Sequence, residues 1–514
     1  MDEGAALTES ILDAPRDDAP RLIYADWCEE NGDPDLGEFI RLQFEAERHA
    51  EWTPARMDLD ERANALLEHN RTRWLQNVPS WALDPKWPPG TGSFLHGFLN
   101  RVSVTAEQFL ESSADLFAVA PILEAQIAAV RDGGTALAGH ADLGRLDRAD
   151  IGFVEEPVNL PAFFASPHIA GLVGLELTFR GPEYPGASWQ VAQPMLDDDG
   201  ARAIASCAGL ARLKSLNLSV GMIGSDGLGA LAESPYLSAL EELNVSAHPV
   251  GDEGLVRLAR SPLLPRLTDL NLCGTNVGDG GLRALLAAGP HRLRRLHIGR
   301  PENCPISDAG MHAFARCEAL AGLRELDLSS WPLTPNLVRA VARSPHLAGL
   351  TVLKLGSCGI DDEMAAELAR SPYLRNLRFL DLQSNQIGAD GLTALARSPV
   401  LATITCLGIF NNPEIGDAGV LALADSDYVG ELRGLGLIWT GLGLAGLRAV
   451  ATSARFRQLR TLDLQNNHLG DEGGRVLCET PHLARLILLT VFDCGFSEDM
   501  KAALRARFGA ALRI

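Results

Sequence analysis

The stretch that decides the fold is "LRFLDLQSNQIGADGLTALARSP", residues 377–399. Its opening "LRFLDL" suits a short strand whose alternate side chains point to opposite faces. The remainder carries Ile387, Leu392 and Leu395 at helical spacing and ends in Ser398-Pro399, and proline disfavours helix at the residue before it. We therefore expect one strand followed by one helix within this stretch.

The "LRFLDL" pattern recurs along most of the chain. Its second apolar position falls at 216, 243, 270, 296, 326, 353, 380, 407, 435, 462 and 489, which is 273 residues over ten intervals. A period of about 27 resembles the long, ribonuclease-inhibitor-like class of leucine-rich repeats. The resemblance implies an α/β solenoid with a parallel β-sheet on the concave side and helices on the convex side.

The repeat array has regular and degenerate parts. Regular units cover 213–496, fainter copies at 99–104, 122–127, 146–151 and 172–177 extend the array back to residue 96, and 497–514 form a C-terminal helix cap. Irregular end units are expected because terminal repeats face water on one side. Polar residues before each helix are expected to cap its free N–H groups, namely Asp226, Asp252, Asp279, Asp308, Asp417, Asp471 and Ser497.

Composition and charge exclude several classes of protein. The formal net charge is −21, so sequence-independent attraction to nucleic acid or to anionic lipid is not expected. Nine cysteines at irregular spacing, with no CxxC pair, favour reduced thiols over a disulfide framework or a zinc site. No apolar run is long enough to span a membrane. These features predict a cytoplasmic, monomeric protein without cofactors.

The N-terminal stretch "DDAPRLIYADWCEENGDPDLGEFIRLQ", residues 17–43, is strongly acidic. An EF-hand loop does not fit, because neither starting position places glycine and glutamate where calcium binding needs them. A helical hairpin fits better: the first helix packs through Ile23 and Trp27, Gly32 stops it, "DPDLG" turns the chain, and Phe39 and Ile40 form the next apolar face.

The same stretch resembles the repeat-companion domain, a short N-terminal module of bacterial proteins that precedes repeat arrays. The matching residues are Asp18, Pro20, Arg21, Leu22, Tyr24, Ala25, Asp26, Trp27, Glu29, Gly32, Asp33, Gly37, Glu38, Phe39, Ile40 and Gln43. The resemblance implies no activity and predicts that repeats follow. We therefore divide the chain into a helical module at 1–50, a helical and irregular cap rich in proline and tryptophan at 51–95, and the solenoid at 96–514.

A basic cluster, "HRLRRLHIGR" at 291–300, is the first candidate site. Arg295, His297 and Arg300 together suggest an anion site. In a stack of parallel strands, however, Arg295 falls between Asp269 and Glu325, and His297 falls between Asn271 and Asp327. Cross-strand charge pairing is the preferred interpretation, with a ligand site as the alternative.

An apolar patch toward the C-terminal end is the second candidate. The outward positions of adjacent strands carry Phe379, Phe410, Ile438, Trp439, Leu488 and Phe492. Clustered outward aromatic residues are typical of protein-binding surfaces. Alternatively, the rings cover Gly408, Gly434 and Gly436, where the strands lack side chains.

A third candidate is the insertion at 178–194, which carries Tyr184 and Trp189 and is either a partner contact or a surface loop. The chain has no GxSxG, Walker-type, HExxH or dinucleotide-binding motif in a suitable context. The sequence therefore predicts a non-catalytic scaffold that binds an unidentified protein partner. The alternative is a regulator of another enzyme, an inhibitor or a GTPase activator, acting through the solenoid rim.

Overall fold

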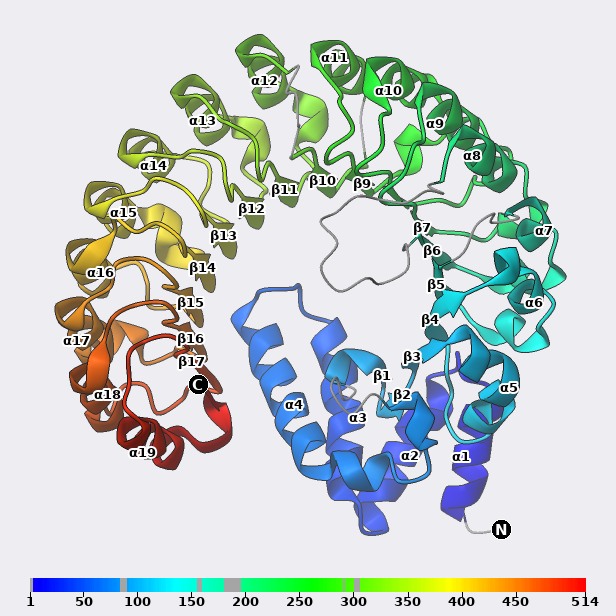
Figure 1. Cartoon of the computed structure of the whole chain (residues 1–514), viewed down its shortest axis with the longest axis horizontal. Coiled ribbons are helices and arrows are strands. Elements are labelled where there is room, and N and C mark those ends of the chain that lie inside the picture. The colour runs from blue at the N-terminus through cyan, green and yellow to red at the C-terminus, as the bar shows by residue number, and fades with distance from the viewer. Residues whose placement is uncertain (1–2, 84–89, 155–159, 180–195, 290–291, 300–305) are drawn as a thin grey trace. The chain divides into compact units, whose positions relative to one another are not determined.

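The computed structural model describes residues 3–83, 90–154, 160–179, 196–289, 292–299 and 306–514. The chain forms two compact units, Met1–Leu267 and Thr268–Ile514. Both carry the strand–helix repeat, with the strands on one side and the helices on the other (Figure 1). Tyr184, Trp189 and Arg300 lie outside the described residues.

The first unit begins with four helices. They are α1 (Glu3–Asp13), α2 (Ala19–Glu30), α3 (Pro34–Glu47) and α4 (Pro54–Trp74). Phe39 and Ile40 are fully buried, as predicted, and Gly32 ends α2 with φ +101°. The prediction for Ile23 is wrong: its side chain is 55% exposed, because α2 packs through Arg21, Ala25 and Cys28.

The predicted turn at "DPDLG" is also wrong, because α3 already begins at Pro34. Asp33 caps this helix by accepting a hydrogen bond from the backbone N–H of Leu36 at 3.2 Å, and proline suits the first helical position. The link between α2 and α3 is therefore shorter than the sequence suggested.

A hairpin and a parallel sheet follow α4 in the first unit. Strands β1 (Phe94–Leu95) and β2 (Phe98–Leu99) pair antiparallel. The sheet strands are β3 (Arg101–Thr105), β4 (Glu124–Val130), β5 (Arg148–Phe153), β6 (Gly174–Phe179), β7 (Ser215–Asn217) and β8 (Glu242–Asn244). The helices among them are α5 (Ala106–Phe117), α6 (Thr135–Ala138), α7 (Leu160–Phe164), α8 (Asp198–Ala205), α9 (Ser225–Ala232) and α10 (Gly251–Arg260). Strands lie at all four of the predicted degenerate copies.

The second unit repeats one short strand and one helix per turn. Its strands are β9 (Asp269–Asn271), β10 (Arg295–His297), β11 (Glu325–Asp327), β12 (Val352–Lys354), β13 (Phe379–Asp381), β14 (Cys406–Gly408), β15 (Gly434–Gly436), β16 (Thr461–Asp463), β17 (Leu488–Thr490) and β18 (Leu512–Arg513). Its helices are α11 (Asp279–Ala287), α12 (Asp308–Ala315), α13 (Pro335–Ala342), α14 (Asp362–Ala369), α15 (Ala389–Ala396), α16 (Gly416–Ala424), α17 (Leu444–Thr452), α18 (Gly470–Glu479) and α19 (Glu498–Phe508). The strands line the concave side of this unit (Figure 1). Strand β18 was not expected from the sequence.

Leucine burial holds each repeat together. The central leucine of each short strand points into the core, and Leu380 and Leu435 are at most 2% exposed. Full burial of one leucine side chain contributes about 1.5–3 kcal/mol. The solenoid is an α/β leucine-rich-repeat fold, as the sequence predicted.

Buried asparagines tie neighbouring units together after the strands. Asn412 is fully buried, and its Nδ2 donates to the carbonyl oxygens of Leu382 and Ile409, while its Oδ1 accepts from the N–H of Ile387. Asn385 and Asn467 make the same pattern of contacts. These amides satisfy backbone groups that the short strands leave unpaired.

A second polar ladder runs along the helix ends. A hydroxyl after each of several helices donates to a carbonyl oxygen at the end of the preceding helix. The donors are Ser166, Ser234, Ser344, Ser371, Ser398, Ser426, Ser453 and Thr480. The Ser-Pro pairs therefore do more than stop a helix, because their serine also links one unit to the next.

The predicted capping pattern is mostly wrong. Of the seven predicted caps, only Ser497 occupies the N-cap position of its own helix. Asp417 instead accepts from the N–H groups of Gly443 and Gly446, which begin the next helix. Asp362 does the same for α15. Because the helices lie side by side, an acid in one first turn reaches the free N–H groups of the next helix.

Candidate interaction surface

The strand register of the second unit aligns outward side chains in columns. One column runs Phe379, Cys406, Gly434, Thr461, Leu488, and the next runs Asp381, Gly408, Gly436, Asp463, Thr490. Neighbouring members are about 4.8 Å apart, the usual spacing of paired strands.

Within the described residues, the basic cluster is matched by acids on neighbouring strands. The Nε of Arg295 donates to Asp269 at 2.6 Å, and the ring of His297 lies between Asp269 at 3.8 Å and Asp327 at 3.6 Å. Lys354 pairs with Glu325 at 2.6 Å. The register of Arg295 between Asp269 and Glu325 is as predicted.

Titration shifts fit this charge ladder. Burial raises the pKa of Asp327, but hydrogen bonds from His297 and Ser329 outweigh it, so the pKa lies below its ordinary value. Burial lowers the pKa of Lys354, but its bond to Glu325 outweighs this and raises the pKa overall. The geometry of Arg295 and His297 thus favours charge pairing over an anion site.

The apolar patch is exposed at its centre. Trp439 is 60% exposed and Phe492 is 42% exposed, whereas Phe379, Phe410 and Ile438 are half-buried. Trp439 also has φ +52°, a left-handed backbone that bulky residues rarely adopt. The equivalent positions elsewhere in this unit carry small or polar residues that also have positive φ: Gly274, Ser330, Ser357, Ser384, Asn411, Asn466 and Asp493.

Aromatic cover explains only part of the patch. The ring of Phe410 lies 3.7 Å from the place that a Cβ at Gly436 would occupy. Gly434 is flanked instead by Cys406 and Thr461, and the nearest side chain to Gly408 is Asp381. The atoms nearest to these three Cβ positions do not include Trp439, so filling space over glycine does not account for it.

Two carboxylates that were not among the predicted site residues flank the glycines. Asp381 is 7% exposed and accepts from the N–H of Gln383 at 3.0 Å and its Nε2 at 2.8 Å. Asp463 and Gln465 repeat this arrangement at 3.1 and 2.9 Å. Burial raises the pKa of both acids. The repeated "DLQ" at 381–383 and 463–465 was the available signal.

A polar pocket of about 220 Å³ lies on the strand side of the first unit. Its charges are largely matched internally: Arg148 lies 3.6 Å from Glu124, and Gln126 donates to Asp150 at 2.7 Å. The pocket therefore offers no strong net charge to a ligand.

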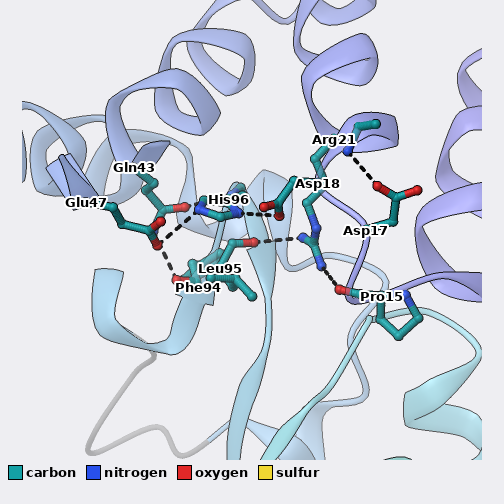
Figure 2. Close-up of polar contacts among 11 residues, drawn as sticks. Pro15, Asp17, Asp18, Arg21, Gln43, Glu47, Phe94, Leu95 and His96 are labelled. Carbon is teal, nitrogen blue, oxygen red and sulfur yellow. Dashed lines mark hydrogen bonds and ion pairs between the residues drawn. The ribbon is translucent and has the colours of Figure 1, made fainter. Parts of the chain in front are cut away.

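Four polar side chains of the N-terminal helices hold the β1–β2 hairpin, and we call them the clasp (Figure 2): Asp18, Arg21, Gln43 and Glu47. His96 is buried between Asp18 at 3.0 Å and Glu47 at 3.1 Å, and its ring stacks on Phe44. Both ring nitrogens of His96 therefore have a carboxylate within hydrogen-bond distance.

Arg21, in the first turn of α2, makes the remaining contacts to the hairpin. Its side chain is fully buried and donates to the carbonyl oxygens of Leu95 and Pro15, each at 2.8 Å (Figure 2). Gln43 accepts from the N–H of Gly97 at 2.7 Å. Polar residues of the N-terminal helices therefore hold the β1–β2 hairpin in place.

Neither a metal cluster nor a membrane-spanning helix occurs among the described residues. No group of three His, Cys, Asp or Glu side chains in those ranges could hold a metal ion. None of the described helices is both long and apolar enough to cross a membrane. Burial raises the pKa of the Cys358 thiol to about 12, which disfavours a reactive thiolate there.

Comparison with known proteins supports the repeat assignment. The sequence model described as "Leucine Rich repeat" matches residues 237–259, 373–396, 400–424 and 457–478. No curated protein sequence is detectably similar.

Similar solved structures are distant. The chain is 20% identical to a chain of the yeast Rad7–Elc1 complex, covering 59% of this chain and 81% of that chain with a TM-score of 0.38. An internalin from Listeria monocytogenes shares 20% identity over 62% of this chain and 94% of that chain, with a TM-score of 0.37. A leucine-rich-repeat protein from Leptospira interrogans shares 16% identity over 80% and 98%, with a TM-score of 0.34. These values are too low to carry an argument about function.

Proposed function

We propose that this leucine-rich-repeat protein is a non-catalytic scaffold that binds a protein partner on the concave side of its second unit. The binding surface comprises Phe379, Phe410, Ile438, Trp439 and Phe492, and we call it the aromatic surface. The observation that carries the proposal is Trp439, which is bulky, 60% exposed and held at positive φ. Positive φ recurs at this position in other units, so the turn belongs to the repeat. A non-glycine residue there costs of order 1–3 kcal/mol, and an exposed tryptophan at such a position supports a role in binding.

Tryptophan is also the residue type most enriched at binding hot spots. Large exposed aromatic residues gain from being buried in an interface, since apolar area removed from water contributes about 25 cal/mol per Å². Phe379, Phe410 and Trp439 lie on or directly after three successive strands, so a partner could contact them together, whereas Phe492 lies beyond β16.

Regulation of another enzyme through the rim is the alternative form of this scaffold role. It would need a blocking or catalytic side chain at the rim, and no observation among the described residues favours one. We further propose that residues 1–50 act as a cap for the array, supported by the contacts of Arg21 and His96 with the β1–β2 hairpin.

A reducing, cytoplasmic environment also belongs to the proposal. Several thiols donate to carbonyl oxygens within the repeats, as Cys358 does to Leu328 at 3.2 Å and Cys494 to Leu464 at 3.1 Å. Oxidation would remove these donors, so the reduced state suits the fold.

A peptide-display selection tests the scaffold role. Random twelve-residue peptides are selected on the wild-type protein and then scored on the Phe410→Ser/Trp439→Ser double variant. We expect the enriched peptides to lose binding to that variant. Leu421→Ser is the matched control, because Leu421 is 46% exposed on α16, away from the strands.

Two results contradict the proposal. One is a pool of peptides that binds the double variant as well as it binds wild type. The other is a pool that is lost only from the Leu421→Ser control. Circular dichroism and the thermal midpoint of each variant establish that it is folded.

A further inference from the structure

We propose that the aromatic surface recognises an extended segment of a partner protein that carries basic side chains at positions i and i+4. This inference rests on the proposed function and adds the chemistry of the partner. Its basis is the arrangement of Asp381 and Asp463 around Gly408 and Gly436, beside the exposed Trp439.

The two carboxylates lack an ion-pair partner in the described part of the chain. Asp381 and Asp463 accept hydrogen bonds from the backbone and amide of Gln383 and Gln465, and none of the described Lys, Arg or His side chains lies within ion-pair distance of either. Lys354 lies next to Asp381 in the register, but its Nζ bonds Glu325 at 2.6 Å. Asp381 is buried and Asp463 is half-buried. A carboxylate that is removed from water without a paired cation is costly, so a basic group brought by a partner would be favoured.

Glycine leaves room for that group to reach the acids. Strands β14 and β15 have no side chain at Gly408 and Gly436, which lie between the two acids in the same column. We call the surface at Gly408 and Gly436 the glycine floor. The Oδ1 of Asp381 lies 3.2 Å from the place that a Cβ at Gly408 would occupy, so this carboxylate lies beside the glycine floor. Gly436 meets only the edge of Phe410 at 3.7 Å.

The distance between the two acids matches the distance between residues i and i+4 of an extended segment. Asp381 on β13 and Asp463 on β16 are three strand spacings apart, which is about 14 Å. In an extended segment, residues i and i+4 share one face and lie about 13 Å apart, and residue i+2 falls midway between them. A segment that crosses the strands would therefore present two basic groups to the acids and place i+2 over the glycine floor.

The surrounding side chains suit an apolar residue at i+2. Phe410 and Ile438 are half-buried beside the floor, and Trp439 projects next to them. Trp439 also offers a ring face to a lysine or arginine, an attraction of about 0.5–1 kcal/mol at exposed sites. The same surface thus combines apolar contact with complementary charge.

Defined fluorescent peptides test the inference. The probe has nine residues, with lysine at its third and seventh positions, leucine at its fifth and serine elsewhere. Its controls carry the second lysine one position earlier, or glutamate in place of both lysines. Fluorescence anisotropy should show binding of the probe to wild type, with binding at least about tenfold weaker for each control peptide.

Two protein variants test separately the charge of the carboxylates and the room that glycine leaves between them. Asp381→Asn/Asp463→Asn keeps the shape of the column and should weaken probe binding about tenfold or more. Gly436→Leu fills the floor without touching either acid and should abolish binding, which keeps the test decisive if the asparagine variant misfolds. The Leu421→Ser control should bind as wild type does.

The outcomes distinguish this inference from the proposed function. Equal affinity of wild type for all three peptides, or undiminished probe binding by both the asparagine and the Gly436→Leu variants, would overturn the inference. If display-selected peptides require Phe410 and Trp439 but are indifferent to Asp381→Asn/Asp463→Asn, the scaffold role stands and the basic-segment inference fails. If they are also indifferent to the aromatic residues, both fail.

Discussion

Replacing Arg21 by methionine should loosen the β1–β2 hairpin in the first unit. Arg21 is fully buried and donates to the carbonyl oxygens of Leu95 and Pro15, each at 2.8 Å. Methionine keeps the apolar length of the side chain but supplies no donor, so both carbonyl groups lose their hydrogen bonds. The β1–β2 hairpin then loses one of its main attachments to α2.

The expected loss of stability is about 3 kcal/mol. Hydrogen bonds to a charged group contribute about 1.5–3 kcal/mol each, which gives roughly 3–6 kcal/mol for two. The lower end applies because burial already lowers the pKa of Arg21 to about 10, so the guanidinium is costly to bury. In a unit of this size, the thermal midpoint would fall by roughly 6 °C.

Hydrogen exchange measured by mass spectrometry locates the effect. Amides in residues 90–100 should exchange faster in Arg21→Met, while those of the second unit stay unchanged. Arg16→Met is the matched control, since Arg16 is about half-exposed and pairs with Asp147 on the surface, where such pairs contribute about 0–1 kcal/mol. Unchanged protection of 90–100, or an equal effect of Arg16→Met, would refute the structural role given to Arg21.

Three further predictions concern the repeats. In chemical denaturation, Asn412→Ala should lower the free energy of unfolding of the second unit by about 4 kcal/mol, because it leaves several buried backbone groups unpaired. The control Asn376→Ala removes one exposed amide contact and should lower it by less than about 1 kcal/mol. Burial raises the pKa of Glu367, but the bond from Arg339 and the charges of further arginines outweigh this, so the folded-state pKa lies below its ordinary value. This carboxylate therefore stabilises the fold above its unfolded pKa of about 4.5. The contribution is lost as the pH falls through the lower folded-state pKa. Glu367→Gln should therefore cost about 1–2 kcal/mol at pH 7 and flatten the acid limb of the stability profile below about pH 5; an unchanged profile would contradict the assignment. Asp362→Ala should fray the start of α15, the following helix, at a cost of about 1 kcal/mol, seen as faster amide exchange there and not in α14.

The sequence was sufficient to predict the strands and their register. Each unit places a leucine at the same point, and a slip by one residue would turn leucines such as Leu380 out to solvent. Placing the leucine pattern of each unit in register aligns the outward columns even where the units differ in length, so this pattern identified the neighbours of Arg295 and the glycine column. Strand β18 escaped notice because its two residues carry no repeat pattern.

Contacts between units and between distant segments were not predictable in the same way. Capping of one helix by the acid of the previous helix depends on how helices lie side by side, which local spacing does not report. The clasp joins Arg21 and Asp18 to Leu95 and His96 across more than seventy residues, so the acidic stretch gave no sign of it. The unusual residue at Trp439 was detectable, since the described units from β11 to β17 otherwise carry Ser, Asn or Asp at that position.

Trp439→Asn tests the central claim most directly. Asparagine tolerates positive φ and restores the residue type found in neighbouring units, so the thermal midpoint should stay the same or rise. In the same samples, the affinity for peptides selected on wild type should fall at least about tenfold, as expected for loss of a hot-spot tryptophan. Wild-type affinity together with unchanged stability would show that Trp439 does not contact a partner and would contradict the account.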